Sequence, residues 1–168
     1  MKRVCAWCDK VLGTMVSKVK GDITHGICQD CLDKLLANNK PATMSKYINK
    51  FEFPVIEVDG TGRIVLANVS ASKMLGKHAD KIKDELCGDA FDCVYAELPG
   101  GCGQTEHCAI CTVRNAVTET YNTGKPLINL EAYQNIKTSR GVKKKRFVIS
   151  TEKIFDLVLL RIKPKKAK

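Results

Sequence analysis

The stretch FPVIEVDGTGRIVLANVSASKMLG, residues 53–76, determines the fold class of the larger part of the chain. It contains two short runs of β-branched and aliphatic residues on either side of the turn DGTG, and this pattern predicts a β-hairpin. The next residues predict a short helix that begins near Asn68 or Ser70 and ends at Gly76. We therefore expect this part of the chain to open with a hairpin and a helix.

The elements expected after residue 76 complete the pattern. A longer helix is predicted at residues 111–125, and Gly124 and Pro126 end it. Its apolar face consists of Val113, Ala116, Val117 and Tyr121. Three strand candidates close the chain, at residues 127–134, 144–151 and 156–163. Two strands, several helices and three strands in this order predict an α+β fold.

Residues 48–163 resemble a PAS domain. The hairpin carries the motif D-x-x-G-x-I-x-x-x-N from Asp59 to Asn68, which recurs widely in PAS sensors, and the last three strands look like the closing antiparallel meander. The resemblance implies a five-stranded antiparallel sheet with flanking helices around a ligand pocket, in a sensory or protein-interaction role. PAS domains bind different ligands or none, so the resemblance implies no particular ligand.

Length and composition agree with one main domain and a small appendage. The chain has 168 residues, of which 44% are apolar and 27% are charged, and these are ordinary values for a folded protein. We expect a metal-binding unit at residues 1–36, a linker at 37–47, a PAS-like domain at 48–163 and a basic tail at 164–168. The linker is predicted from Pro41 and the small polar residues around it.

The first 36 residues contain two C-x2-C pairs that predict a zinc site. Cys5 and Cys8 are separated by 19 residues from Cys28 and Cys31, which matches the spacing of four-cysteine zinc sites. Each pair delivers two sulfurs to one side of a tetrahedral ion. The residues between the pairs are β-rich and interrupted by glycines, so we expect a hairpin or an extended loop there. The unit resembles the zinc-ribbon-like cysteine knuckles found beside PAS and other bacterial signalling modules.

A second set of cysteines lies in the middle of the PAS-like region, within residues 87–111. Four of them, Cys93, Cys102, Cys108 and Cys111, provide a full tetrahedral shell and resemble a cysteine-rich variant of PAS sensors. Zinc would make this site a structural staple, an iron–sulfur cluster would make it a sensor, and free reactive thiols are the third alternative. We leave Cys87 outside the ligand set, although it could replace Cys93.

The net charge of +10 suggests an acidic partner, but the charge of the metal-bound chain would be lower. Two four-thiolate sites that each hold a divalent ion would lower it to about +6. Much of the remaining charge lies in the runs at residues 143–146 and 163–168, and such runs are more often solvated faces than nucleic-acid footprints.

The chain ends and motifs bear on location and activity. No apolar stretch of a signal peptide follows the basic residues at the N-terminus, and the longest aliphatic run is LVLL, residues 157–160. We therefore expect a cytoplasmic protein, without membrane contact, whose nine cysteines serve as metal ligands or thiols rather than in disulfides. No phosphate loop, nucleophile elbow or paired catalytic carboxylate is recognisable, so we do not expect an enzyme.

The favoured interpretation is a stand-alone sensory PAS protein with two metal centres that acts by contact with a separate signalling protein. A homodimer is left open. The alternative is a zinc-ribbon regulator whose basic hairpin binds nucleic acid, and steep loss of affinity with added salt would identify it.

Overall fold

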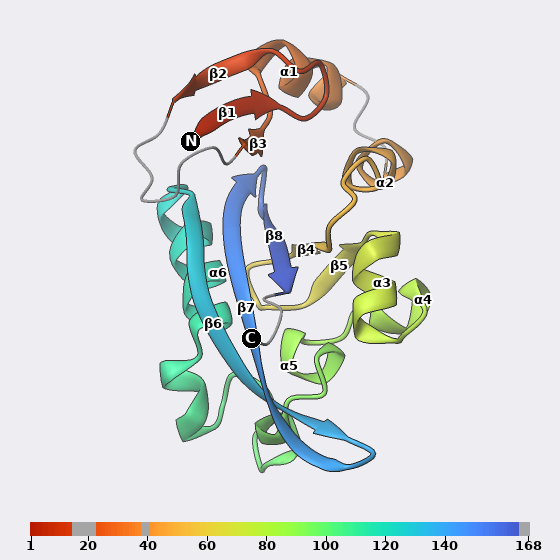
Figure 1. Cartoon of the computed structure of the whole chain (residues 1–168), viewed down its shortest axis with the longest axis vertical. Coiled ribbons are helices and arrows are strands. Elements are labelled where there is room, and N and C mark those ends of the chain that lie inside the picture. Colours follow the sequence, from red (N-terminus) through yellow and green to blue (C-terminus); the bar gives the residue numbers. More distant parts are fainter. Residues whose placement is uncertain (15–22, 38–40, 165–168) are drawn as a thin grey trace. The chain divides into compact units, whose positions relative to one another are not determined.

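The hairpin expected at residues 53–68 is present in the computed structural model, as strands β4 (Val55–Val58) and β5 (Ile64–Ala67) (Figure 1). The turn between them is organised by Asp59. Its Oδ1 accepts hydrogen bonds from the backbone N–H of Thr61 at 2.8 Å and of Arg63 at 3.0 Å. Gly62 has φ +88°, a conformation that favours glycine, which explains the last glycine of DGTG.

Asn68 joins this hairpin to the first helix of the domain, α3 (Val69–Leu75). Its Oδ1 accepts from the N–H of Ala71 at 2.8 Å, which caps the helix, and from the N–H of Val55 at 3.0 Å. Its Nδ2 donates to the carbonyl of Phe53 at 2.9 Å. The helix ends at Gly76 in the left-handed conformation, as the sequence predicted.

The remaining elements build one sheet and its helical cover. The sheet has five strands in the order β5-β4-β8-β7-β6, and every pairing in it is antiparallel. Strands β6 and β7 form a long twisted ribbon, and α6 runs along β6 (Figure 1). The elements after α3 are α4 (Ala79–Ile82), α5 (Cys87–Ala90), η1 (Val94–Glu97), η2 (Glu106–Ile110), α6 (Thr112–Thr123), β6 (Leu127–Thr138), β7 (Gly141–Ile154) and β8 (Leu157–Pro164).

The core lies between one face of this sheet and helices α3 to α6. Phe91, at the end of α5, meets Phe147 of β7 edge to face at 5.9 Å between ring centroids. Helix α6 contributes Val113, Ala116 and Val117, the apolar face predicted from sequence. Its Tyr121 ring packs so closely against Gly60 of the hairpin turn that a Cβ there would lie 2.5 Å away. The predicted fold class is confirmed.

The structure describes residues 1–14, 23–37 and 41–164, and the chain divides into two compact units, Met1–Phe51 and Glu52–Lys168. In the first unit, β1 (Lys2–Cys5) pairs antiparallel with β2 (Val11–Thr14) and parallel with β3 (Ile23–Gly26). Strands β2 and β3 therefore do not pair with each other, as a simple hairpin would require. Helix α1 (Gln29–Ala37) follows the second cysteine pair.

The predicted linker at residues 37–47 differs from the structure, because residues 41–48 form helix α2 (Pro41–Ile48). Proline is favoured at the first helical position, where its missing N–H is not needed. Tyr47 stacks on Trp7 at 5.7 Å and meets Phe51 edge to face at 5.5 Å. These contacts explain why the first unit extends to Phe51 rather than ending at residue 36. Residues 38–40, and residues 165–168 of the predicted basic tail, lie outside the described residues.

None of the helices in the described part of the chain combines the length and the apolar character needed to cross a membrane.

The three hydrogen bonds of Asn68 predict that Asn68→Ala lowers the free energy of unfolding by about 3 kcal/mol, the combined cost of a lost cap and of unpaired buried backbone groups. The neighbouring Ser70→Ala, which removes one exposed hydrogen bond to the carbonyl of Glu52, is the matched control and should cost less than about 1 kcal/mol. Urea unfolding of both variants measures the difference. Equal losses would show that Asn68 does not join the hairpin to α3.

Candidate metal centres

The four cysteines of the first unit form one cluster. The sulfurs of Cys5, Cys8, Cys28 and Cys31 lie within 4.8 Å of one another, and Cys8 Sγ is 3.6 Å from Cys28 Sγ. Cys5 ends β1, and the turn after it brings Cys8 back to the same point, while Cys28 and Cys31 flank the start of α1. The backbone N–H of Cys28 donates to Cys5 Sγ at 3.3 Å, a bond typical of metal-binding knuckles. This predicted set can hold a metal ion.

The pKa values of Cys5 and Cys31 are shifted in opposite directions, so the four thiols do not all ionise together without a cation. Burial raises the pKa of Cys5, but backbone hydrogen bonds from Cys28, Trp7 and Cys8 outweigh it and lower the pKa to about 6. Burial and the neighbouring sulfurs raise the pKa of Cys31 to about 12. Without a metal ion the cluster cannot carry four thiolates, so metal binding must displace protons.

The five cysteines of the second unit line one cavity. Its volume is about 260 Å³, and its wall contains Cys87, Cys93, Cys102, Cys108 and Cys111. Cys87 begins α5, Cys93 precedes η1, and Cys111 is the N-cap residue of α6. Cys102 lies in the glycine-rich turn and Cys108 lies in η2. The structure thus brings the four predicted ligands to one cavity, together with Cys87.

Three of these sulfurs accept hydrogen bonds from backbone N–H groups. The N–H of Gly88 donates to Cys102 Sγ at 3.3 Å, and the N–H of Gly103 donates to Cys108 Sγ at 3.0 Å. Cys93 interacts with the N–H groups two and three residues later in the chain, as Cys5 does in the first cluster. Backbone donors of this kind stabilise a thiolate, so these sulfurs are prepared for a metal.

Cys87 has a different environment. Burial raises its pKa to about 12, and the charges of Cys102 and Cys111 act in the same direction. No other residue's backbone N–H lowers its pKa, and the thiol keeps its proton. Sequence spacing did not show that Cys87 faces the same cavity, because α5 and its N-terminal turn are needed to direct it there.

The second set is not gathered like the first. Among the described residues, the only group of three or more metal-binding side chains whose ligand atoms all lie within 4.8 Å is the N-terminal cluster. The sulfurs of the second set surround a space instead of meeting at a point. Whether Cys93, Cys102, Cys108 and Cys111 share one metal centre therefore stays a prediction.

Polar and cationic groups complete the wall of the cavity. Arg114 and Lys144 both line it, and Arg114 helps to lower the pKa of Cys108, together with hydrogen bonds from Thr105 and Gly103 that outweigh the effect of burial. Gln134 of β6 also lines the cavity, is 6% exposed, and its Oε1 has no partner among the described residues. This oxygen is available to a hydrogen-bond donor in the cavity, such as a water molecule.

Comparison with solved structures identifies the fold of the second unit. The PAS domain of nitrogen regulation protein NR(II) from Vibrio parahaemolyticus matches with a TM-score of 0.50 and 11% identity, over 73% of this chain and 97% of that chain. The second unit has the PAS fold. A PAS domain from Colwellia psychrerythraea also matches, with a TM-score of 0.49 and 12% identity, over 74% of this chain and 95% of that chain. The PAS domain of BvgS from Bordetella pertussis matches with a TM-score of 0.47 and 15% identity, over 78% of this chain and 90% of that chain. No protein-family model and no curated protein matches the sequence.

Trp7 is the only tryptophan of the chain and stacks on Tyr47, so its fluorescence reports the state of the first unit alone. We expect Cys5→Ser or Cys28→Ser to lose one metal ion and to shift the Trp7 emission to longer wavelength, because the first unit loses its cross-link while the PAS fold keeps its circular dichroism. Cys87→Ser is the control and should leave the emission unchanged. Unchanged emission in the metal-free Cys5→Ser protein would contradict the prediction.

The opposite shifts of Cys108 and Cys87 predict their reactivity in the metal-free chain. Cys108, with its lowered pKa, should react with iodoacetamide at neutral pH well before Cys87, whose pKa is about 12. Thr105→Val removes a 3.2 Å contact between a hydroxyl and Cys108 Sγ, and should slow labelling at Cys108 only. Peptide mass spectrometry over time measures both rates. Faster labelling of Cys87 would contradict the assigned environments.

Proposed function

We propose that this chain is a sensory PAS protein with two metal centres: a structural zinc ion held by Cys5, Cys8, Cys28 and Cys31, and a second centre, zinc or an iron–sulfur cluster, that serves as the sensing site. The second centre is held by Cys93, Cys102, Cys108 and Cys111. The protein acts by contact with a signalling partner.

One observation carries this proposal: five of the nine cysteines meet at a single cavity inside the PAS unit. Thiols gathered in this number, with backbone donors directed at three of them, suit a soft metal centre better than an organic ligand. The N-terminal cluster supports zinc, because its four sulfurs already have the short spacing of a tetrahedral thiolate site.

Direct contacts connect the second site to the sheet. The segment that carries Cys93 is hydrogen bonded to β6 through Lys137 N–H and Asp92 O at 2.8 Å. Asn135 of β6 donates to the hydroxyl of Tyr95 at 2.9 Å, and the Tyr95 ring stacks on His107 at 3.9 Å. A change at Cys93 or Cys108 therefore reaches β6 through at most two side chains.

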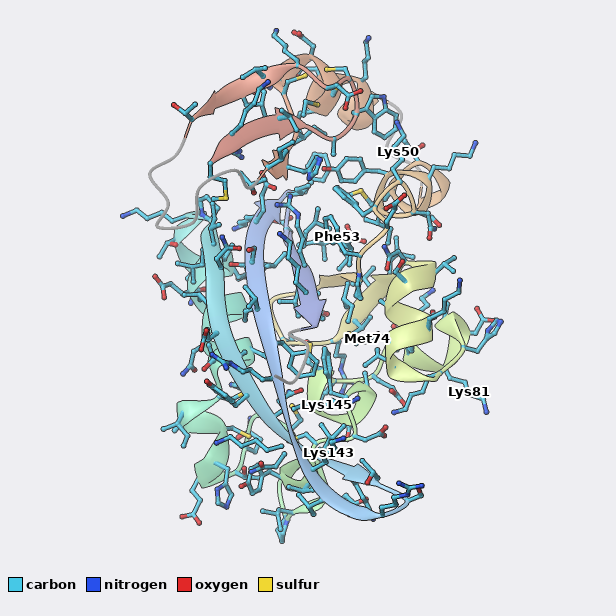
Figure 2. The ribbon with its side chains drawn as sticks, in the orientation of Figure 1. Lys50, Phe53, Met74, Lys81, Lys143 and Lys145 are labelled. Atoms are coloured by element: carbon cyan, nitrogen blue, oxygen red, sulfur yellow. The ribbon has the colours of Figure 1, made fainter. Side chains whose placement is uncertain are left out.

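The ribbon of β6 and β7 is suited to contact a partner. Its turn region carries Val142, which is 66% exposed, and Lys143 and Lys145 follow along β7 (Figure 2). Part of the nearby charge is neutralised, because Lys137 pairs with Glu97 and Arg146 with Glu131. A mixed apolar and basic surface of this kind supports contact with an acidic protein face more than binding along a nucleic-acid backbone.

Metal analysis of single variants tests the proposal. We expect two metal centres in the unchanged chain, loss of the first alone in Cys28→Ser, and loss of the second alone in Cys102→Ser and Cys108→Ser. Cys87→Ser should lose neither, because Cys87 lies outside the proposed ligand set and its thiol lacks the backbone donors that Cys93, Cys102 and Cys108 have. Metal content unchanged in Cys102→Ser and Cys108→Ser would show that these cysteines are free thiols, and the sensing site would be wrong.

Hydrogen exchange supplies the control for signalling. Loading the second centre should slow exchange along β6, whereas Cys108→Ser should exchange at the rate of the metal-free chain. Exchange along β6 that is the same with and without the second centre would contradict a sensory role.

A further inference from the structure

We infer that the second centre is a four-cysteine iron–sulfur cluster and not a single zinc ion. This inference rests on the proposed sensing site and names its occupant. The ligands are Cys93, Cys102, Cys108 and Cys111, and Cys87 lines the same cavity outside the ligand set.

The spacing of the sulfurs separates the two metals. Four thiolates around one zinc ion, with Zn–S bonds of about 2.3 Å, lie about 3.8 Å from one another. The N-terminal cluster approaches this geometry, since its sulfurs all lie within 4.8 Å of one another. In the same structure no three sulfurs of the second set do so, and every cysteine of that set belongs to the described residues. In a cluster each cysteine binds a different iron atom or shares one with a single neighbour, so its ligands stand farther apart.

The size of the cavity also favours a cluster over a single zinc ion. A zinc ion in a closed tetrahedral site fills the space between its ligands and leaves no void. The cavity that these sulfurs line measures about 260 Å³, which is more than ten times the roughly 10–15 Å³ that a single water needs, so it has room for an occupant of several atoms.

The polar groups of the wall match a cluster with bridging sulfides. Gln134 lines the cavity with a buried side-chain amide, and the NH2 group of such an amide is a donor that bridging sulfides can accept. Arg114 and Lys144 offset the negative charge that four thiolates leave on an iron–sulfur cluster. The backbone N–H groups of Gly88 and Gly103 already donate to two of the cysteine sulfurs.

Close packing around one ligand also explains a glycine. A Cβ at position 88 would lie 2.7 Å from Cys102 Sγ, so only glycine lets the start of α5 approach this sulfur. The glycine places its own N–H on the sulfur at the same time.

Anaerobic reconstitution of the full chain with ferrous iron and sulfide tests the inference. We expect a brown protein with about two or four iron atoms and as many inorganic sulfides per chain, and a visible spectrum that bleaches in air. Cys93→Ser, Cys102→Ser and Cys108→Ser should each lose most of the visible absorption. Cys87→Ser, in the same cavity, and Cys28→Ser, at the other centre, are the matched controls and should keep it.

A second variant keeps the test valid if a ligand substitution disturbs folding. Thr105→Val retains the ligands and the shape of the side chain but removes the 3.2 Å hydroxyl contact with Cys108 Sγ. We expect it to lose iron to a chelator about tenfold faster, as the loss of an outer hydrogen bond to a metal ligand predicts. Thr118→Val, on the exposed face of α6, should match the unchanged chain.

Three outcomes would overturn the inference. A colourless protein with two zinc ions per chain, one of them lost in Cys102→Ser, would leave the proposed function in place and replace the cluster by zinc. A colourless protein with one zinc ion and five alkylatable thiols in the PAS unit would remove the second centre and the proposed sensing site together. A brown protein whose colour survives in Cys102→Ser and Cys108→Ser would place the iron elsewhere.

Discussion

A stretch of twenty residues without a single buried side chain, from Asp92 to Cys111, is the constraint on which the site depends. Ordering a residue costs about 1–2 kcal/mol of backbone entropy, and here no apolar core offsets that cost. The segment is held by a few polar contacts, such as Tyr95 with Asn135 and Lys137 with Glu97, and by its cysteines. Cross-links between those cysteines would supply the missing stabilisation, as metals do in domains too small for a core.

In the first unit the cost of ordering the chain is offset in a different way. The buried residues of its cysteine cluster are Cys5, Cys28 and Cys31, packed by Trp7, Leu12 and Ile27, whereas Cys8 is exposed. Tyr47 of helix α2 and Phe51, which follows the helix, are added to them, so the unit combines a metal site with a small aromatic core. The second set of cysteines lies beside a PAS core of ordinary size, and the aromatic residues in the wall of its cavity are the stacked pair Tyr95 and His107 and, from β6, Tyr133.

The sequence predicted those parts of the fold that have local signals. The DGTG turn, the Asn68 cap and the Gly124 stop each belong to a few neighbouring residues, and all are found. Helix α2 was missed because its apolar residues pack on Trp7, which is distant in sequence. The full length of β6 and β7 was missed because residues 135–143 are mostly polar and lack the alternation of a half-buried strand. Spacing located the first cysteine cluster, whereas the place of Cys87 depends on α5 and could not be read from spacing.

The core and the cavity are built largely from different residues, and this arrangement suits the proposed sensing role. The PAS core packs the sheet against α3 to α6, and of its buried residues Val113 alone also lines the cavity, while the partly buried Cys87 and Cys111 pack against the core at its margin. An occupant can therefore enter, leave or change at the cavity while the core stays folded, because the two depend on different interactions. The cysteine segment is joined to β6, the edge strand of the sheet, by the contacts of Asp92 and Tyr95. Because the cysteine segment lies against the edge strand, the proposed role requires only that chemistry at sulfur changes these contacts with β6.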